Sequence, residues 1–195
     1  DYKGQNLYEL LDRYAHWEIC ASLDGCGRVG EYIRTGLDYS SWLANFEMGV
    51  QHQKHRRQMR IDFTLTLPGM DQLDGIIDLA DAYGVNVLCK LVFAFTPDII
   101  LSPLALPRHI LVDWIEQIQQ QIQSKITQRT QAIWDTLEHL KTRQTFEEQW
   151  PNDYKQALSR GKQHLLKLET IRQQNITMDE ILATYKPAQT WWRNL

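Results

Sequence analysis

Two stretches in the first half of the chain alternate between apolar and polar positions, which is the pattern of a β-strand with one buried face, and a third, mostly apolar stretch also predicts a strand. These stretches cover residues 17–23, 59–67 and 85–95. Between them, apolar residues recur at helical spacing, first from Tyr39 to the basic run at 52–57 and then from Asp71 to Tyr83. Strands that alternate with helices in this way predict βαβ units and a parallel sheet.

Residues that begin or end helices accompany these patterns. Ser40 or Ser41 is expected to cap the first helix and Asp71 the second, because their side-chain oxygens accept hydrogen bonds from free backbone N–H groups. Gly84 follows the second helix, in the position where a left-handed backbone favours glycine.

From residue 108 the chain is rich in Gln, Lys, Glu and Leu and has no strand-like run. Apolar spacing predicts helices at 108–124, 127–143, 152–173 and 177–185, and Pro187 is expected to end the last one. Three parallel strands cannot close a barrel or cover both of their edges. We therefore expect residues 1–106 to be the end of a larger sheet domain and residues 107–195 to be a helical region.

Composition narrows the class of protein. The chain has 195 residues, 43% hydrophobic positions and a formal net charge of −3, so it can bury a core and gives no general electrostatic reason to expect a nucleic acid partner. No apolar run is long enough to span a bilayer, and no membrane partner is expected. The three cysteines are odd in number and irregularly spaced, which favours a reducing, cytoplasmic location over a disulfide framework.

The run "ASLDGCGRVGEYIRTG" at 21–36 begins at the end of the first strand and carries candidate chemistry. Ligands of parallel α/β folds bind beyond the carboxyl ends of the strands. There Ser22 and Asp24 could bind sugar hydroxyls, the glycines could allow close backbone approach, and Arg34 could bind a carboxylate. A plain turn followed by a solvated arginine explains the same residues equally well.

These residues also resemble a known family. "ICASLDG", followed by Arg34 in "YIRTG", is similar to the fourth strand and following loop of radical S-adenosylmethionine enzymes, especially members with a twitch-type iron–sulfur region. The resemblance continues through "WLANFEMGV", "RIDFTLTL", "LDGIIDLADAYGV" and "NVLCKLVFAF" to "LKLETIRQQNITMDEILATYKP". It covers most of the chain and implies the C-terminal half of a partial (β/α)6 TIM-like barrel with parallel strands, followed by a helical segment.

The resemblance assigns a cofactor to particular residues. It implies that Ser22 and Asp24 contact the ribose of S-adenosylmethionine and that Arg34 binds its carboxylate. Thr64 and Thr66 would lie near the methionine and adenosyl groups. The backbone from Leu91 to Phe93 would lie near the adenine.

One departure from the family concerns its [4Fe–4S] cluster. Three cysteines, usually in a CxxxCxxC motif, bind that cluster, whereas Cys20, Cys26 and Cys89 do not form such a motif, so no metal ligand is assigned here. We expect the cysteine ligands of the cluster to lie in a missing N-terminal half of the protein. The full-length protein is then expected to be an enzyme, and this chain alone is expected to be inactive. The resemblance then implies reductive cleavage of S-adenosylmethionine at the cluster to start radical chemistry, with an electron donor as partner; the sequence identifies neither the substrate nor the catalytic residues.

Polar residues of the strands are further candidates. If the helices cover one face, Glu18, Asp62 and Cys89 face the barrel interior with Ser22, Thr64 and Thr66, while Leu88 faces the helices. Asp62 could position a substrate or pair with Lys90 or Arg60. Alternatively, all of these inward-facing polar residues could form a hydrogen-bond network with a purely structural role.

Two other functions are compatible with the pattern. A non-catalytic α/β module whose helical tail binds a protein partner would need no cluster. A hydrolase or aldolase would need a nucleophile beside a base, and no convincing pair is found. The basic run "HQKHRR" at 52–57 suggests phosphate or RNA binding, although a cationic complement to a helix dipole explains it more simply.

Overall fold

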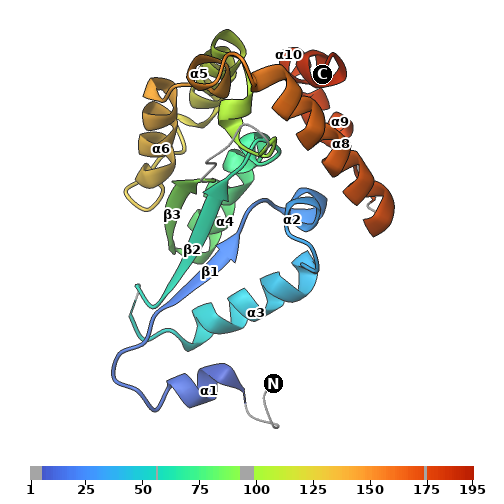
Figure 1. The fold of residues 1–195 in the computed structure, drawn as a ribbon. Helices are drawn as coiled ribbons and strands as arrows, with labels where there is room; N and C mark the ends of the chain where they lie inside the picture. Colours follow the sequence, from blue (N-terminus) through green and yellow to red (C-terminus); the bar gives the residue numbers. More distant parts are fainter. Residues whose placement is uncertain (1–5, 56, 93–98, 174) are drawn as a thin grey trace.

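The computed structural model describes residues 6–55, 57–92, 99–173 and 175–195. Its centre is a three-stranded parallel sheet in the order β1-β2-β3 (Figure 1). The strands are β1 (Ile19–Leu23), β2 (Met59–Leu65) and β3 (Asn86–Leu91). Helices connect each strand to the next, as parallel pairing requires, so the predicted α/β class and the parallel sheet are confirmed.

Helices make up most of the remaining described chain. Before β3 they are α1 (Leu7–Leu11), α2 (Gly27–Ile33), α3 (Tyr39–His52), the 3₁₀ helix η1 (Met70–Gln72) and α4 (Leu73–Tyr83). After β3 they are η2 (Pro103–Ala105), α5 (Arg108–Ile122), α6 (Gln131–Thr142), α7 (Phe146–Gln149), α8 (Tyr154–Arg172), α9 (Met178–Ile181), η3 (Leu182–Thr184) and α10 (Lys186–Arg193). No described helix is both long and apolar enough to cross a membrane.

The two faces of the sheet differ in chemistry. In β2, Ile61, Phe63 and Leu65 are fully buried, whereas the alternate residues are only half-buried. In-register pairing of the parallel strands places Ser22, Asp62 and Leu88 side by side on the second face, where Leu88 is 40% exposed. We call this second face the open face.

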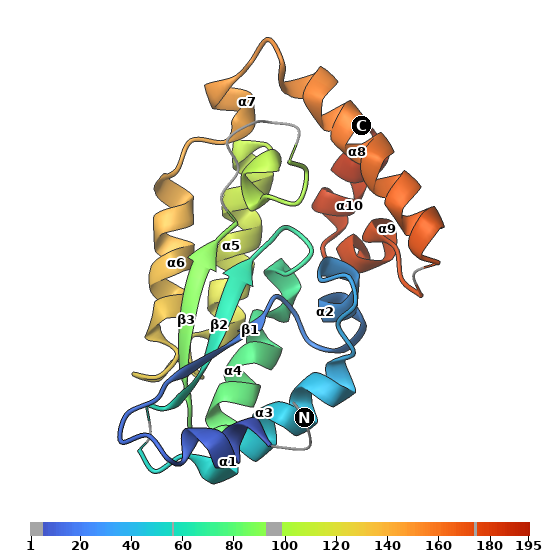
Figure 2. The same cartoon turned by 60° about the horizontal axis from the view of Figure 1, so that its bottom comes forward.

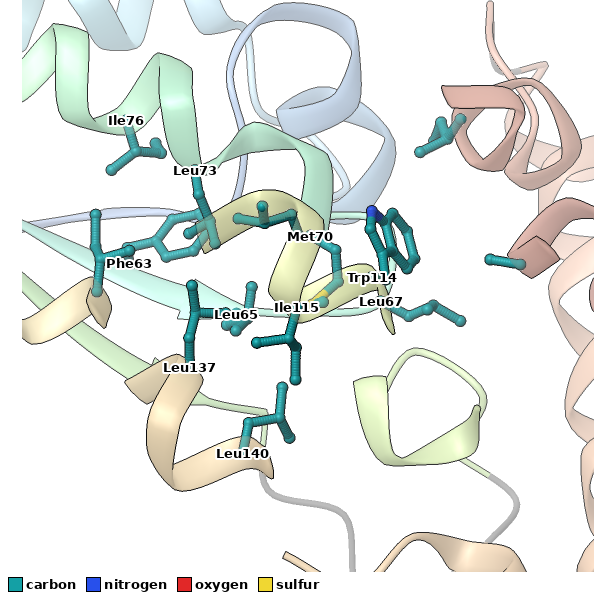
Figure 3. Packing of buried hydrophobic residues seen from close by; sticks show 14 of the residues in the cluster. Phe63, Leu65, Leu67, Met70, Leu73, Ile76, Trp114, Ile115, Leu137 and Leu140 are labelled. Carbon is teal, nitrogen blue, oxygen red and sulfur yellow. The ribbon is translucent and has the colours of Figure 1, made fainter. Parts of the chain in front are cut away.

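Three helices cover the first face. Figure 2 shows α4 and α5 behind the sheet, and Figure 3 shows their side chains meeting those of β2 and α6. The residues in contact there include Phe63, Leu65, Leu73, Ile76, Ile115, Leu137 and Leu140. Each fully buried side chain of this size contributes roughly 1.5–3 kcal/mol of transfer free energy, so this layer is the main source of stability.

The hydrophobic core continues across the expected boundary at 106/107. Leu106 and Leu111 belong to the same cluster of buried residues. The Tyr154 hydroxyl of α8 donates a hydrogen bond of 2.8 Å to the carbonyl of Ala105. The C-terminal helices therefore pack on the sheet region through both apolar and polar contacts.

One ion pair and one set of hydrogen bonds stabilise the packing of the C-terminal helices further. The Arg108 guanidinium at the start of α5 binds both carboxylate oxygens of Glu148 in α7, with a shortest distance of 2.5 Å. The buried Tyr32 hydroxyl of α2 donates to the carboxylate of Glu169 in α8 at 2.7 Å, and the Met178 N–H binds the same oxygen at 2.8 Å.

Several predicted helix ends need correction. The helix that begins at Tyr39 is capped by Asp38, whose carboxylate accepts the Ser41 N–H at 2.7 Å, and not by Ser40 or Ser41. Asp71 is not a cap either, because it lies inside η1. Pro187 does not end a helix but lies in the first turn of α10, where its missing N–H costs nothing.

Other predicted elements agree with the structure. Gly84 ends α4 with φ +65°, as expected of a left-handed C-terminal glycine. The four expected C-terminal helices correspond to α5, α6, α8 and α9 with η3. The short helix α7 and the helix α2 in the glycine-rich run were not expected.

The predicted orientation of β3 is wrong by one residue. Cys89 pairs with Phe63 and packs against the helix-covered core, while Leu88 pairs with Asp62 on the open face. Lys90 also lies on the open face, beside Thr64. The nearly continuous apolar run at 85–95 could not define a buried face, because alternation is the only local signal of strand orientation.

Candidate functional site

Charged side chains on the open face pair across neighbouring strands. The Lys90 ammonium lies 2.8 Å from the Asp62 carboxylate. The Arg60 guanidinium lies 2.8 Å from the Glu18 carboxylate and donates from Nε to the Cys20 sulfur at 3.0 Å. Asp62 thus makes the pair with Lys90 that the sequence analysis considered, whereas Arg60 pairs with Glu18.

Hydroxyl groups mark the carboxyl end of this face. Ser22 is the next-to-last residue of β1, and Thr64 is the next-to-last residue of β2. Both are half-buried on the open face, and neither side chain makes a hydrogen bond within the described parts of the chain. Their hydroxyls are therefore available to a polar ligand at the end of the strands where parallel α/β folds bind ligands.

Asp24 lies directly after β1 and is only 7% exposed. Its Oδ2 accepts two hydrogen bonds from Arg34, at 3.0 Å from Nε and 2.7 Å from Nη2. Its Oδ1 is buried and has no hydrogen-bond partner. A buried carboxylate oxygen without a partner is costly, so this atom is a candidate acceptor for a ligand hydroxyl or ammonium group.

Arg34 ends α2, and its side chain is 42% exposed. The bond to Asp24 brings its guanidinium to the same end of β1 as Ser22. Sequence reasoning assigned Asp24 and Arg34 to different parts of one ligand, whereas the structure joins them to each other. Arg34 can bind an external carboxylate only with its remaining N–H groups or by exchanging its partner.

The glycine-rich run is a tightly folded helix start. A Cβ on Gly30 would lie 2.1 Å from the carbonyl oxygen of Gly25, so residue 30 must be glycine for α2 to pack on the preceding loop. The Cys26 N–H donates to the side chain of Gln72 at 3.2 Å, which ties this loop to η1. The glycines were expected to let a ligand approach the backbone closely. At Gly30, the group that makes this close approach is the carbonyl of Gly25 in the same chain.

The remaining predicted site residues lie in different surroundings. Thr66 is buried, and its hydroxyl accepts the Gly69 N–H at 3.1 Å, which stabilises the turn after β2. Leu91 packs partly buried against the hydrophobic core. Phe93 lies outside the described residues.

The cysteines do not come together. Cys20 is exposed on the open face, Cys26 precedes α2, and Cys89 packs against the core. Burial raises the pKa of the Cys26 thiol, and burial raises the pKa of the Cys89 thiol to about 12, so both favour the neutral thiol. Among the described residues no group of three or more His, Cys, Asp or Glu side chains could hold a metal ion.

Sequence reasoning did not find the hollows of this structure, although it did identify the basic run at 52–57 that ends at Arg57. An apolar hollow of about 890 Å³ lies between α5, α8 and α10, with Tyr154, Tyr185 and Trp191 in its lining. Two smaller hollows lie at the amino ends of the strands and share Arg57. Neither could be found from local patterns, because each brings together residues from segments far apart in the chain.

Comparison with protein-family models, with curated proteins and with solved structures finds no match to this chain.

Proposed function

We propose that this chain is the C-terminal portion of a radical S-adenosylmethionine enzyme and that the carboxyl end of its open face contributes to binding the cofactor. The observation that carries the proposal is the polar open face of a parallel sheet, which ends at Ser22, Thr64 and the Asp24–Arg34 pair. Parallel sheets are normally covered on both faces, so a polar face of this kind suits the interior of a larger barrel.

The chemistry of this end fits S-adenosylmethionine. The free hydroxyls of Ser22 and Thr64 can hydrogen bond to ribose hydroxyls or to the carboxylate. The unpartnered Oδ1 of Asp24 can accept a hydrogen bond from a ribose hydroxyl or from the ammonium group. Arg34 would have to bind the carboxylate while it keeps, or exchanges, its bond to Asp24.

The residues present do not fit a [4Fe–4S] cluster. Cys20 and Cys89 point to opposite faces of the sheet, and Cys26 lies in the loop that leads into α2. Three thiolates from these positions cannot reach one cluster without rebuilding the sheet. The proposal therefore requires cluster ligands from another segment, and no step of the radical chemistry is assigned to residues of this chain.

The coding sequence upstream of residue 1 provides the first test. A CxxxCxxC motif roughly 80–120 residues before Ser22, a spacing typical of three βα units, is expected. An intact start codon directly before residue 1 would contradict the proposal.

Binding of S-adenosylmethionine provides the second test, by calorimetry on the protein that joins this chain to its cluster-binding segment. Loss of a neutral hydrogen bond in Ser22→Ala is expected to weaken binding about fivefold, and Arg34→Ala about tenfold or more. Ser40→Ala, on the exposed surface of α3, is the matched control and should bind as the wild type does. Equal affinity in all three variants would contradict the assignment of this end of the sheet.

The apolar hollow favours one second candidate, a non-catalytic module whose C-terminal helices bind a partner protein. Its lining includes the buried Tyr154 and Tyr185 and the partly exposed Trp191, and aromatic side chains are enriched at protein interfaces. Under this alternative the chain binds no S-adenosylmethionine, and Trp191→Ala abolishes partner binding instead.

A further inference from the structure

A basic surface lies at the amino ends of the three strands, opposite the end that carries Ser22. Two adjoining hollows define it, of about 610 Å³ and about 450 Å³, and Arg57 lines both. The first is also lined by His16, Trp17, Glu18, His55, Gln58 and Arg60, and the second by Asn86, Thr127, Gln128 and Arg129 among others. We call the two hollows together the amino-end basic surface.

Two guanidinium groups on this surface are not neutralised. Neither Arg57 nor Arg129 makes an ion pair or a side-chain hydrogen bond with any residue in the described ranges. The neighbouring cations differ, because Arg60 pairs with Glu18 at 2.8 Å and Lys54 with Asp12 at 3.3 Å. In a chain whose net charge is −3, two free guanidiniums in adjoining hollows form a local anion-binding field.

The loop that presents Arg57 is held in place by hydrogen bonds. The buried Gln58 side chain accepts the backbone N–H groups of Lys54, at 2.5 Å, and of His55, at 2.9 Å. The Gln58 carbonyl accepts the Ile19 N–H at 2.7 Å, which ties the loop to the start of β1. Because α3 ends at His52, Arg57 lies five residues beyond the last residue of that helix.

On the far side of the surface, Arg129 is fixed by the edge of the sheet. Its backbone carbonyl accepts the Val87 N–H of β3 at 2.9 Å. The surface therefore extends across the amino ends of all three strands, which is about 10 Å at the usual strand spacing. This length exceeds one phosphate group and suits successive phosphates of an extended chain.

We propose that the amino-end basic surface binds the backbone of a single-stranded nucleic acid, with Arg57 and Arg129 on successive phosphates. The rings of His16, Trp17 and His55 line the hollow beside Arg57, and aromatic rings are the stacking platforms that single-stranded binders use. This favours a nucleic acid over a polyanion without bases. The site lies away from the proposed cofactor end and does not depend on the function proposed there.

The test measures binding of the 195-residue chain to a fluorescein-labelled oligothymidylate of about 12 nucleotides, by fluorescence anisotropy over a range of salt concentrations. For two phosphate contacts, log K should fall with log salt with a slope of about −1.4. Arg57→Gln and Arg129→Gln should each weaken binding about fivefold and reduce the slope to about −0.7. Arg143→Gln, an exposed arginine near the other end of β3, is the matched control and should change neither value.

Three results would overturn the proposal. They are wild-type affinity in the Arg57→Gln/Arg129→Gln double variant, absence of binding at low ionic strength, and equal competition by inorganic polyphosphate of matched charge. The last result would show that the bases contribute nothing. Far-ultraviolet circular dichroism of each variant separates lost binding from lost folding.

Discussion

The pair between Asp24 and Arg34 makes a sharp prediction about stability. Asp24 is only 7% exposed, and its Oδ1 already lacks a hydrogen-bond partner. Removing the guanidinium in Arg34→Ala also takes the partner from Oδ2, so that neither oxygen of this buried carboxylate is hydrogen bonded. Hydrogen bonds to charged groups contribute about 1.5–3 kcal/mol, whereas exposed ion pairs contribute about 0.2–1 kcal/mol. Because the Arg34 side chain is 42% exposed, we expect a coupling free energy between these values, about 1–2 kcal/mol.

The assay is a double-mutant cycle. The free energy of unfolding is measured by urea titration for the wild type, Arg34→Ala, Asp24→Ala and the double variant. Arg34→Ala should lose about 2–3 kcal/mol, since it also leaves a buried charge unpaired. Asp24→Ala should lose less, because water can solvate the half-exposed arginine. Arg28→Ala, on the exposed surface of the same helix α2, should change the free energy by less than about 0.5 kcal/mol.

A coupling free energy below about 0.3 kcal/mol would refute this reasoning. It would mean that the guanidinium is not held by Asp24 in solution. Arg34 would then be free to bind an external carboxylate at no cost in stability, as the sequence resemblance implies.

Three further predictions test other parts of the structure. In urea titrations, Gly30→Ala should cost at least about 3 kcal/mol of unfolding free energy, because a Cβ at position 30 lies 2.1 Å from a backbone carbonyl oxygen. The control Gly36→Ala places its Cβ in open space and should cost only about 1 kcal/mol, because of the positive φ at that position. Equal losses in the two variants would contradict the close approach at Gly30. The Arg108 partner of Glu148 lowers the pKa of that carboxyl from 4.5 to about 2, so the pair stabilises the fold above about pH 4.5, and this stabilisation is lost as the pH falls through about 2. By urea unfolding, Glu148→Gln should be about 1 kcal/mol less stable than the wild type at pH 7, allowing for partial exposure, and the two should become equal only below about pH 2. Cys89 should react with a thiol reagent at pH 8 far more slowly than the exposed Cys20, because burial raises its pKa to about 12; equal rates would show that β3 is turned the other way.

Local sequence patterns determined the three strands and most of the longer helices of this fold, together with their order. Alternation in β1 and β2, the helical spacing in α4 to α6 and the glycine at position 84 each depend on neighbouring residues alone, and the structure confirms them. The parallel sheet followed from the same patterns, because a helix between two strands leaves little choice of direction. The hydroxyl of Ser22 was also placed correctly at the carboxyl end of β1.

Only the tertiary structure decided which groups meet. That Arg34 binds Asp24, that Cys89 faces the core and that Arg57 lies near Arg129 all depend on packing between distant segments. Local alternation is lost where a strand is apolar on both faces, and the partner of a charged side chain is set by the register of neighbouring strands. The sequence thus determined the scaffold through short-range periodicity, whereas the pairing of its polar groups needed the three-dimensional fold, because Coulomb and hydrogen-bond energies depend on distances in space rather than along the chain.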